Sequence, residues 1–368
     1  MGINSWHLLD MDIPRSSTFD AMIAPRFRSS AKSAIPLNTI QRNSRKKILY
    51  GLREETLEII NAVCPFCTSK LRIVVSEIDT YGIPGEHAVC EECGCFYASR
   101  HLSSDSLTAI YDSLYRDLDR GDQKGQAGLF RLEEDKGRKI LRYLNEHNFD
   151  NHPGSLVVDV GCGAGGTLNI FREIGMNVFG IDIGSEYIAY GQKKNLAIVD
   201  CSIEDLGLHL ESGSVDLFIV DQVLEHIQSP ASLLKTLRSF MKTDGKIYIS
   251  VPGFRNIGSH YMFDIKRYLQ FVHLLHFDAC MLERFLIAEG FKVEMIDESV
   301  VAVASINDSL RKPRMATCPS YSDVIDFLNE TEKLRAKMKN RIASFLLIKV
   351  VWTLGALRAD MKRLFARV

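Results

Sequence analysis

The chain has 368 residues, of which 46% are hydrophobic and 25% charged, and its formal net charge is −1. This composition is typical of a globular protein long enough for a full α/β domain plus smaller modules. The near-neutral charge gives no general reason to expect nucleic acid as a partner. No apolar run reaches the roughly 18 residues of a membrane-spanning helix, and the first residues lack the pattern of a signal peptide.

Residues 1–47 predict a basic, partly disordered arm. Periodicity is weak there, serine and proline are frequent, and basic residues outnumber acidic ones. A solvated arm is the simpler interpretation, and contact with a phosphate-bearing partner is the alternative.

Residues 48–100 predict a zinc ribbon. Two Cys-x-x-Cys pairs, Cys64 with Cys67 and Cys90 with Cys93, are separated by 22 residues. Four thiolates at this spacing can bind one tetrahedral Zn²⁺, and a site closed by four thiolates is structural rather than catalytic. Reduced structural cysteines or a redox pair are the alternatives, and Cys95 is a spare thiol that could replace Cys93. Because nine cysteines is an odd number and four of them form metal-type pairs, we expect a reducing, cytoplasmic compartment rather than a disulfide framework.

Residues 101–150 predict a helical linker with two apolar stripes and a break at 121–128. The second helix leads directly into the next domain. Tyr111 and Tyr115 lie on the first stripe, where core packing is the simpler role and a substrate entrance is the alternative.

The stretch 157–166 organises the largest predicted domain, residues 151–305. It reads as a buried strand that ends in the glycine pattern of Gly161, Gly163 and Gly166, followed by a helix. Such a turn lets polar groups of a ligand approach bare backbone at a helix N-terminus. Nicotinamide and flavin enzymes use the same pattern, so it is not specific alone. Asp159, two residues before Gly161, adds a carboxylate that could reach an ammonium group or orient the turn.

This Asp-x-Gly-x-Gly stretch resembles motif I of the class I S-adenosylmethionine (SAM) methyltransferases, in which the turn holds the amino-acid half of SAM. The resemblance covers about residues 135–305 and implies an α/β, Rossmann-like sheet of seven strands with the last one antiparallel. The cofactor-binding residues that it and the pattern predict are Asp159, Gly161, Cys162, Gly163, Gly165, Asp182, Ile183, Ser202, Ile203, Asp221 and Gln222.

Asp182 ends a second apolar strand, where a carboxylate can accept both ribose hydroxyls of a nucleoside. NAD enzymes use the same arrangement. Ile183 would pack against the adenine, and residues 202–206 resemble the loop that touches the adenine edge, although Asp205 could simply cap a helical turn.

The segment that runs from Asp221 to Ile227 resembles motif IV of small-molecule methyltransferases and follows a predicted central strand. It lacks the Asn/Asp-Pro-Pro-aromatic motif of many base-amine methyltransferases, which counts against that chemistry. An insertion over 254–277 follows the fifth predicted strand. It resembles a His-x-x-Phe element of polysaccharide-cluster methyltransferases, and this resemblance implies that His276 is a candidate base. The predicted catalytic residues are His276, His226 and Glu225, with packing or capping as the alternative role of both histidines.

Residues 306–368 predict a basic amphipathic helical tail. Apolar residues of its last part fall on one helical face, namely Leu346, Val350, Leu354, Leu357, Met361 and Leu364. Such a helix could lie on an anionic membrane, or pack on this domain or on a second subunit of a homodimer.

The function we predict is methyl transfer from SAM to a small-molecule or glycan acceptor, such as a lipid-linked saccharide, most simply to oxygen. The N-terminal zinc ribbon extends the resemblance to polysaccharide and sugar biosynthesis methyltransferases, although sugar C-methyltransferases usually carry a further large domain. The alternatives are an RNA base methyltransferase, a non-catalytic binding protein with this fold, and a dehydrogenase. The expected location is the cytoplasm, with peripheral contact at the inner membrane face as an option.

Overall fold

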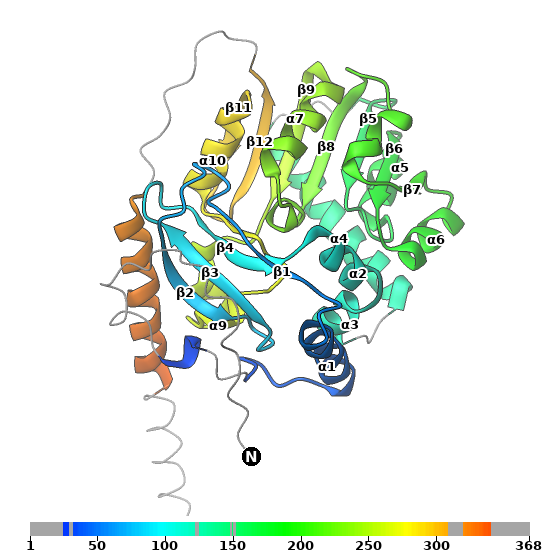
Figure 1. The fold of residues 1–368 in the computed structure, drawn as a ribbon. Coiled ribbons are helices and arrows are strands. Elements are labelled where there is room, and N and C mark those ends of the chain that lie inside the picture. Colours follow the sequence, from blue (N-terminus) through cyan, green and yellow to red (C-terminus); the bar gives the residue numbers. More distant parts are fainter. Residues whose placement is uncertain are drawn as a thin grey trace, which may run out of the picture.

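The computed structural model describes residues 25–28, 32–121, 125–147, 149, 152–307 and 319–339. These residues form two sheets and the helices around them (Figure 1).

The larger sheet has seven strands in the order β11-β12-β9-β8-β5-β6-β7. Strand β12 is antiparallel to both of its neighbours, and the pairs from β9 to β7 are parallel. This arrangement confirms the predicted class I methyltransferase sheet with its last strand antiparallel. The strands are β5 (Leu156–Val160), β6 (Asn177–Asp182), β7 (Ile198–Asp200), β8 (Val215–Asp221), β9 (Met241–Ser250), β11 (Phe291–Ile296) and β12 (Val301–Ile306).

Alternating side chains of the central strands bury both faces of this sheet. Val157 packs with α4 and α5, whereas its neighbour Val158 packs with α7 and α10, because successive side chains of a strand point to opposite faces. A strand that is buried on both faces reads as a continuous apolar run, as the sequence does here. The covering helices are α4 (Gly125–Glu146), α5 (Gly166–Glu173), α6 (Ser185–Lys193), α7 (Pro230–Phe240) and α10 (Ala279–Ala288).

The smaller sheet contains the predicted ribbon and one strand from outside it. Its order is β1-β4-β3-β2, and β10 pairs antiparallel with Phe96 and Tyr97 at the start of β4. Strand β10 belongs to the insertion after β9, so the large domain contributes a strand to the ribbon sheet. The strands are β1 (Ile59–Asn61), β2 (Arg72–Ile78), β3 (Pro84–Cys90), β4 (Phe96–Leu102) and β10 (Leu275–His276).

The prediction of a partly disordered arm over residues 1–47 is wrong for its last residues, because helix α1 spans Thr39–Arg53. Asn38 caps the helix by accepting from the backbone N–H of Gln41, whose side chain bonds back to the N–H of Asn38. The Gln41 amide also donates to the carbonyl of Leu118, which ties α1 to α3. This capping box and the fully buried Ile48 are the local signals for the helix. Residues 1–24 and 29–31 lie outside the described residues.

The linker and the insertion form short helices around the ribbon sheet. The linker forms α2 (Ser104–Ser113) and α3 (Tyr115–Arg120), and the insertion forms η4 (Phe254–Asn256), α8 (Ile257–Tyr261) and α9 (Ile265–Tyr268). Remaining 3-10 turns are η1 (Pro25–Phe27), η2 (Ile203–Leu208) and η3 (Leu224–His226).

Residues 321–339 form a helix that runs along the ribbon sheet (orange in Figure 1). Its Val324, Ile325 and Leu328 are buried in one cluster with residues of β2 and of the insertion. Glu332 pairs with Arg26, which also pairs with Asp264. The described part of the predicted tail is therefore packed, and the stripe from Leu346 onward lies outside the described residues. Among the described helices, none has the length and apolarity needed to cross a bilayer.

Candidate functional site

The glycine turn lies between β5 and α5 and takes conformations that favour glycine. Gly161, Gly163 and Gly165 have φ angles of +72°, +58° and +84°. Gly161 is exposed, whereas the Cys162 side chain is buried against Gly180. The thiol of Cys162 is therefore not presented to a ligand.

Every backbone N–H from 161 to 166 already has a protein acceptor. Gly161 and Cys162 donate to the carbonyl of Ile181, and Gly165 donates to that of Cys162. The remaining donors reach carboxylates: Gly163 donates to Asp182 at 2.8 Å, while Ala164 and Gly166 donate to Glu133 at 3.2 and 3.0 Å. The turn therefore presents acceptor oxygens beside its backbone instead of a set of free N–H donors.

Glu133 is a site residue that the sequence analysis missed. It lies on α4, is 9% exposed, and holds the two N–H groups named above. Burial raises the pKa of its carboxyl, against the lowering effect of these hydrogen bonds. The available signal was a glutamate on the apolar face of α4, which also buries Phe130 and Ile140.

Asp182 ends β6 directly above the turn, as predicted. One carboxylate oxygen accepts from Gly163 and the other from Gly184, each at 2.8 Å. The Arg116 guanidinium lies 3.4 Å from the second oxygen and stacks on the ring of Tyr187 at 4.0 Å. Ile183 beside it is 43% exposed, so an apolar surface is open at the predicted adenine position.

Asp159 and Asp221 add two more carboxyls to this edge of the sheet. Asp159 is 4% exposed, and its pKa is raised well above the usual range by burial and by the charges of Asp221 and Glu133. Lys136 on α4, also missed from the sequence, donates to Asp221 at 2.8 Å. Four carboxyl groups thus surround the turn, and Lys136 and Arg116 pair with two of them. The carboxyl oxygens can accept hydrogen bonds from a ligand.

The predicted adenine loop follows β7 next to Asp182. The backbone N–H of Cys201 donates to the carbonyl of Asp182 at 3.4 Å. Ser202 donates to Asp205 at 3.0 Å at the start of η2, and Ile203 is half-buried. Asp205 thus bonds to the Ser202 side chain, and no side-chain hydrogen bond from the described residues caps the backbone at the start of η2.

Gln222 follows β8 with a φ of +59°, an uncommon conformation for a residue other than glycine. Its backbone N–H donates to Ser250 of β9 at 2.8 Å, and its side chain reaches the Ser250 hydroxyl at 3.2 Å. Strained backbone of this kind is frequent at functional sites.

Glu225 and His226 lie in η3, one turn beyond Asp221. Glu225 is 1% exposed, and burial raises its pKa to about 8. His226 Nδ1 lies 2.7 Å from the Tyr111 hydroxyl and 3.1 Å from the Val272 carbonyl oxygen, and burial lowers the pKa of its ring to about 4. The insertion closes over them, since Leu274 donates its backbone N–H to the carbonyl of Glu225 at 2.7 Å.

His276 lies in β10, which contacts η3 and pairs with β4 of the ribbon. It is 1% exposed, its Nε2 is 2.9 Å from Nδ1 of His87, and its ring packs on Phe96 of β4. These contacts match the packing role considered for it. Its use as a base stays a prediction.

The four predicted zinc ligands come together. The sulfur atoms of Cys64, Cys67, Cys90 and Cys93 all lie within 4.8 Å of one another, with Cys64–Cys93 and Cys67–Cys90 at 3.5 Å. Zn–S bonds of about 2.3 Å in a tetrahedron put sulfur atoms about 3.8 Å apart. The donor set and spacing therefore fit a structural Zn²⁺. Cys95 is not in this group.

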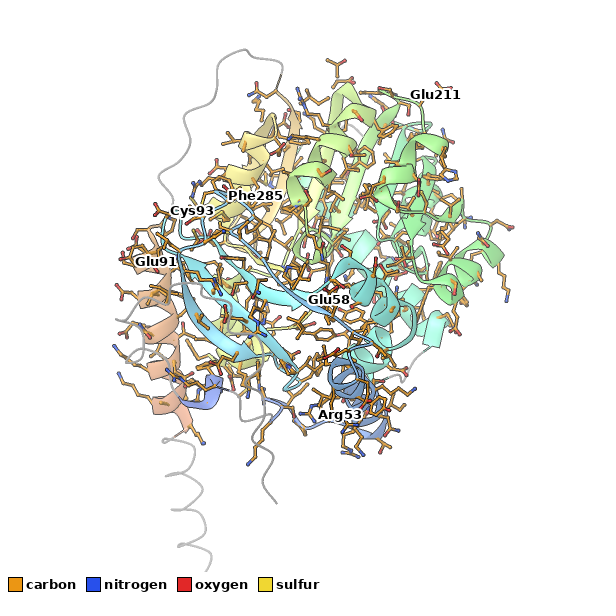
Figure 2. The ribbon with its side chains drawn as sticks, in the orientation of Figure 1. Arg53, Glu58, Glu91, Cys93, Glu211 and Phe285 are labelled. Atoms are coloured by element: carbon orange, nitrogen blue, oxygen red, sulfur yellow. The ribbon has the colours of Figure 1, made fainter. Side chains whose placement is uncertain are left out.

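The ribbon knuckles pack on the large domain. Phe66 of the first knuckle meets Phe285 of α10 edge-on at 5.0 Å, and Arg284 donates to the carbonyl of Cys93 at 3.3 Å. Figure 2 shows Cys93 close to Phe285. The four-cysteine group is thus joined to a helix that covers the large sheet.

Comparison with known proteins identifies the large domain. Residues 158–249 match the model of the family described as "Methyltransferase domain". The ubiquinone biosynthesis O-methyltransferase of Acinetobacter baumannii (strain AYE) is 30% identical over 104 residues, which are 26% of this chain and 44% of that protein. An uncharacterized 37.1 kDa protein in transposon TN4556 of Streptomyces fradiae is 31% identical over 118 residues, which are 30% of this chain and 34% of that protein. The chain thus spans less than half the length of these curated relatives.

Solved structures of methyltransferases also resemble the chain. A SAM dependent methyltransferase from Archaeoglobus fulgidus is 23% identical, with 60% of this chain and 91% of that chain covered and a TM-score of 0.39. Magnesium protoporphyrin IX methyltransferase from Synechocystis PCC 6803 is 16% identical, with 56% and 100% covered and a TM-score of 0.41.

Proposed function

We propose that this chain, whose residues 158–249 form a methyltransferase domain, transfers the methyl group of SAM to a hydroxyl of a glycan or another small molecule. The observation that carries the choice of cofactor is the glycine turn. All its backbone N–H groups are bonded within the protein, and carboxylates of Asp182 and Glu133 take three of them.

A dinucleotide needs those N–H groups for its pyrophosphate, which carries negative charge. SAM has no phosphate, and its sulfonium and ammonium groups are positive. The turn therefore offers a pyrophosphate no free donor, whereas carboxyl oxygens beside it can accept hydrogen bonds from the ammonium group of SAM. This argues for SAM against the dehydrogenase alternative.

Oxygen as the methyl acceptor is supported by the groups beyond β8. A hydroxyl becomes a better nucleophile when a base removes its proton as the attack proceeds. Glu225, with a pKa raised to about 8, and His226 are the bases nearest to the end of β8. Several of the curated relatives are named O-methyltransferases, which supports the same chemistry.

Aromatic side chains beside these bases could bind the apolar face of a ring in the acceptor. Tyr111 and Tyr115 pack edge-on at 4.8 Å, and both rings lie beside His226. Aromatic side chains of this kind bind sugar or aromatic rings through their faces and hydroxyl groups. Most of the rate would come from holding the acceptor in line with the methyl–sulfur bond.

Calorimetry tests the cofactor assignment. SAM and its demethylated product should bind to the wild-type chain, and NAD should not. Replacement of Asp182 by alanine should weaken SAM binding by about 2 kcal/mol or more, because a charged acceptor of the ribose hydroxyls is lost and the N–H of Gly163 is freed. Unchanged SAM affinity in Asp182→Ala would exclude the ribose role.

We further propose that the acceptor is a lipid-linked saccharide. The basic tail would then lie on the cytoplasmic face of an anionic membrane. The support for this proposal is the sequence of residues 340–368 alone. We expect the full chain to co-sediment with vesicles that contain anionic lipid, and a chain that ends at Lys339 to stay in the supernatant. Equal, negligible binding of both would leave the tail as a packing or dimer element.

A further inference from the structure

Two buried side chains and one half-buried side chain beyond β8 bring their potential ligand atoms close together. Glu225 and His226 come from η3, and His273 comes from the insertion. One potential ligand atom of each residue lies within 4.8 Å of the others, and the Glu225 carboxylate oxygen is 3.7 Å from His226 Nε2. The imidazole rings of His226 and His273 meet edge-on at 4.8 Å. The cluster is thus compact and drawn from two segments far apart in the sequence.

Glu225 and His273 have buried polar atoms that lack hydrogen-bond partners among the described residues. Both carboxylate oxygens of Glu225 are buried without a donor, and so is Nδ1 of His273. Glu225 is 1% exposed and His273 is 5% exposed. An unpartnered buried carboxylate is costly, so this cluster favours a positively charged occupant, which is either a proton or a cation.

His226 is oriented as a ligand rather than as a donor toward the cluster. A hydrogen on Nδ1 would be shared between the Val272 carbonyl oxygen at 3.1 Å, which can only accept, and the Tyr111 hydroxyl oxygen at 2.7 Å. The neutral ring then has its lone pair on Nε2, the atom that faces Glu225. Metal-binding histidines commonly have this arrangement, with the second nitrogen bonded to a carbonyl oxygen.

We propose that Glu225, His226 and His273 bind a divalent cation. Donors about 2.0–2.2 Å from one ion lie about 3–4 Å from each other, which agrees with the 3.7 Å between Glu225 and His226. Two imidazoles and one carboxylate suit borderline divalent ions such as Mn²⁺, Fe²⁺ or Zn²⁺ and leave coordination positions open. This site differs in donor type from the four-thiolate ribbon site.

The role of the cation rests on the proposed methyl transfer. An acceptor hydroxyl that occupies an open position would lose its proton to water more readily. Its oxygen lone pair then forms the bond to the methyl carbon, the carbon–sulfur bond breaks, and that electron pair stays on sulfur as a neutral thioether. The cation would thus select an acceptor that presents a hydroxyl group.

Manganese titration tests the site on the full chain with zinc in the ribbon. Free Mn²⁺ is followed by its electron paramagnetic resonance signal, since Mn²⁺ prefers oxygen and nitrogen to thiolates. We expect one equivalent of Mn²⁺ per wild-type chain. Glu225→Gln and His273→Ala should each weaken that binding at least tenfold, and the matched control His260→Ala, an exposed histidine of the same insertion, should bind like the wild type.

The outcomes separate the cation from the methyl donor. Ribbon zinc content and thermal unfolding establish that each variant is folded, and the near-isosteric Glu225→Gln covers the case in which His273→Ala is not. SAM binding without any Mn²⁺ binding, or equal Mn²⁺ affinity in wild type and variants, would overturn the cation site and leave the methyl-transfer proposal standing. In that case one proton shared between Glu225 and His226 fills the cluster. Mn²⁺ binding without SAM binding would overturn the methyl-transfer proposal and leave the cation site standing.

Discussion

Replacement of Gly166 by alanine is expected to destabilise the chain by about 3 kcal/mol and to remove SAM binding. A Cβ at this position would overlap the carbonyl oxygen of Phe130 and lie 2.7 Å from both Cβ of Glu133 and the backbone nitrogen of Glu134. Two of these contacts are backbone atoms of α4, which cannot move aside as a side-chain tip can. Overpacking of this kind typically costs about 1–3 kcal/mol, occasionally more.

The same substitution would disturb the cofactor turn. Separation of α4 from α5 draws the Glu133 carboxylate away from the N–H groups of Ala164 and Gly166. Urea unfolding gives the loss of stability, and calorimetry gives the loss of SAM affinity.

Gly207→Ala is the matched control for this prediction. Its Cβ would meet only the ring of Phe240, at an ordinary 3.5 Å, and its φ is not in the left-handed region. We expect wild-type stability and SAM binding in this variant. A Gly166→Ala chain as stable as Gly207→Ala would contradict the close packing of α4 on α5.

The cofactor turn shows why part of the site could be predicted from sequence. Gly161, Gly163 and Asp182 were found because the turn needs glycine at fixed offsets and a strand end fixes where the next carboxylate lies. Glu133 and Lys136 carry no such local signal. They reach the turn only because α4 packs across α5, and that register is set by tertiary contacts of the two helices.

The second sheet shows the same limit at larger scale. The Cys-x-x-Cys spacing predicted the four-thiolate group, since a tetrahedral metal fixes how the knuckles meet. Nothing in the two-residue strand β10 predicted its pairing with β4, or the contact of His276 with His87. Pairing between segments about 180 residues apart depends on where the insertion returns to the sheet, which no local pattern encodes.

Replacement of Cys64 by serine is expected to remove the zinc and to lower the stability of the whole chain, including the large domain. Cys64 is fully buried and its sulfur is 3.5 Å from that of Cys93. Structural zinc in small modules binds with about 10–16 kcal/mol of apparent free energy, which appears as folding free energy. We expect a loss of at least about 3 kcal/mol in chemical unfolding, and metal analysis should show less than one equivalent of zinc.

The loss should extend to the acceptor side because the ribbon and the large domain share structure. Arg284 of α10 bonds to Cys93 and stacks on Phe66 at 4.3 Å, so loosened knuckles release a helix of the large sheet. On the other side, Ala98 of β4 donates to the carbonyl of Leu274, whose own N–H holds the carbonyl of Glu225. Methyl transfer should therefore fall more than SAM affinity, since the glycine turn lies outside this chain of contacts.

Cys95→Ser is the matched control, because this buried thiol neighbours the group but is not one of its four members. It should keep a full equivalent of zinc and a single unfolding transition, as in the wild type. If Cys64→Ser retained its zinc, a different ligand set would hold the metal, with Cys95 the first candidate. In another outcome, Cys64→Ser loses its zinc and the large domain unfolds in a separate transition at the wild-type midpoint. The ribbon would then be an independent module, and the contacts that link Cys93 and β4 to Glu225 would not stabilise the large domain.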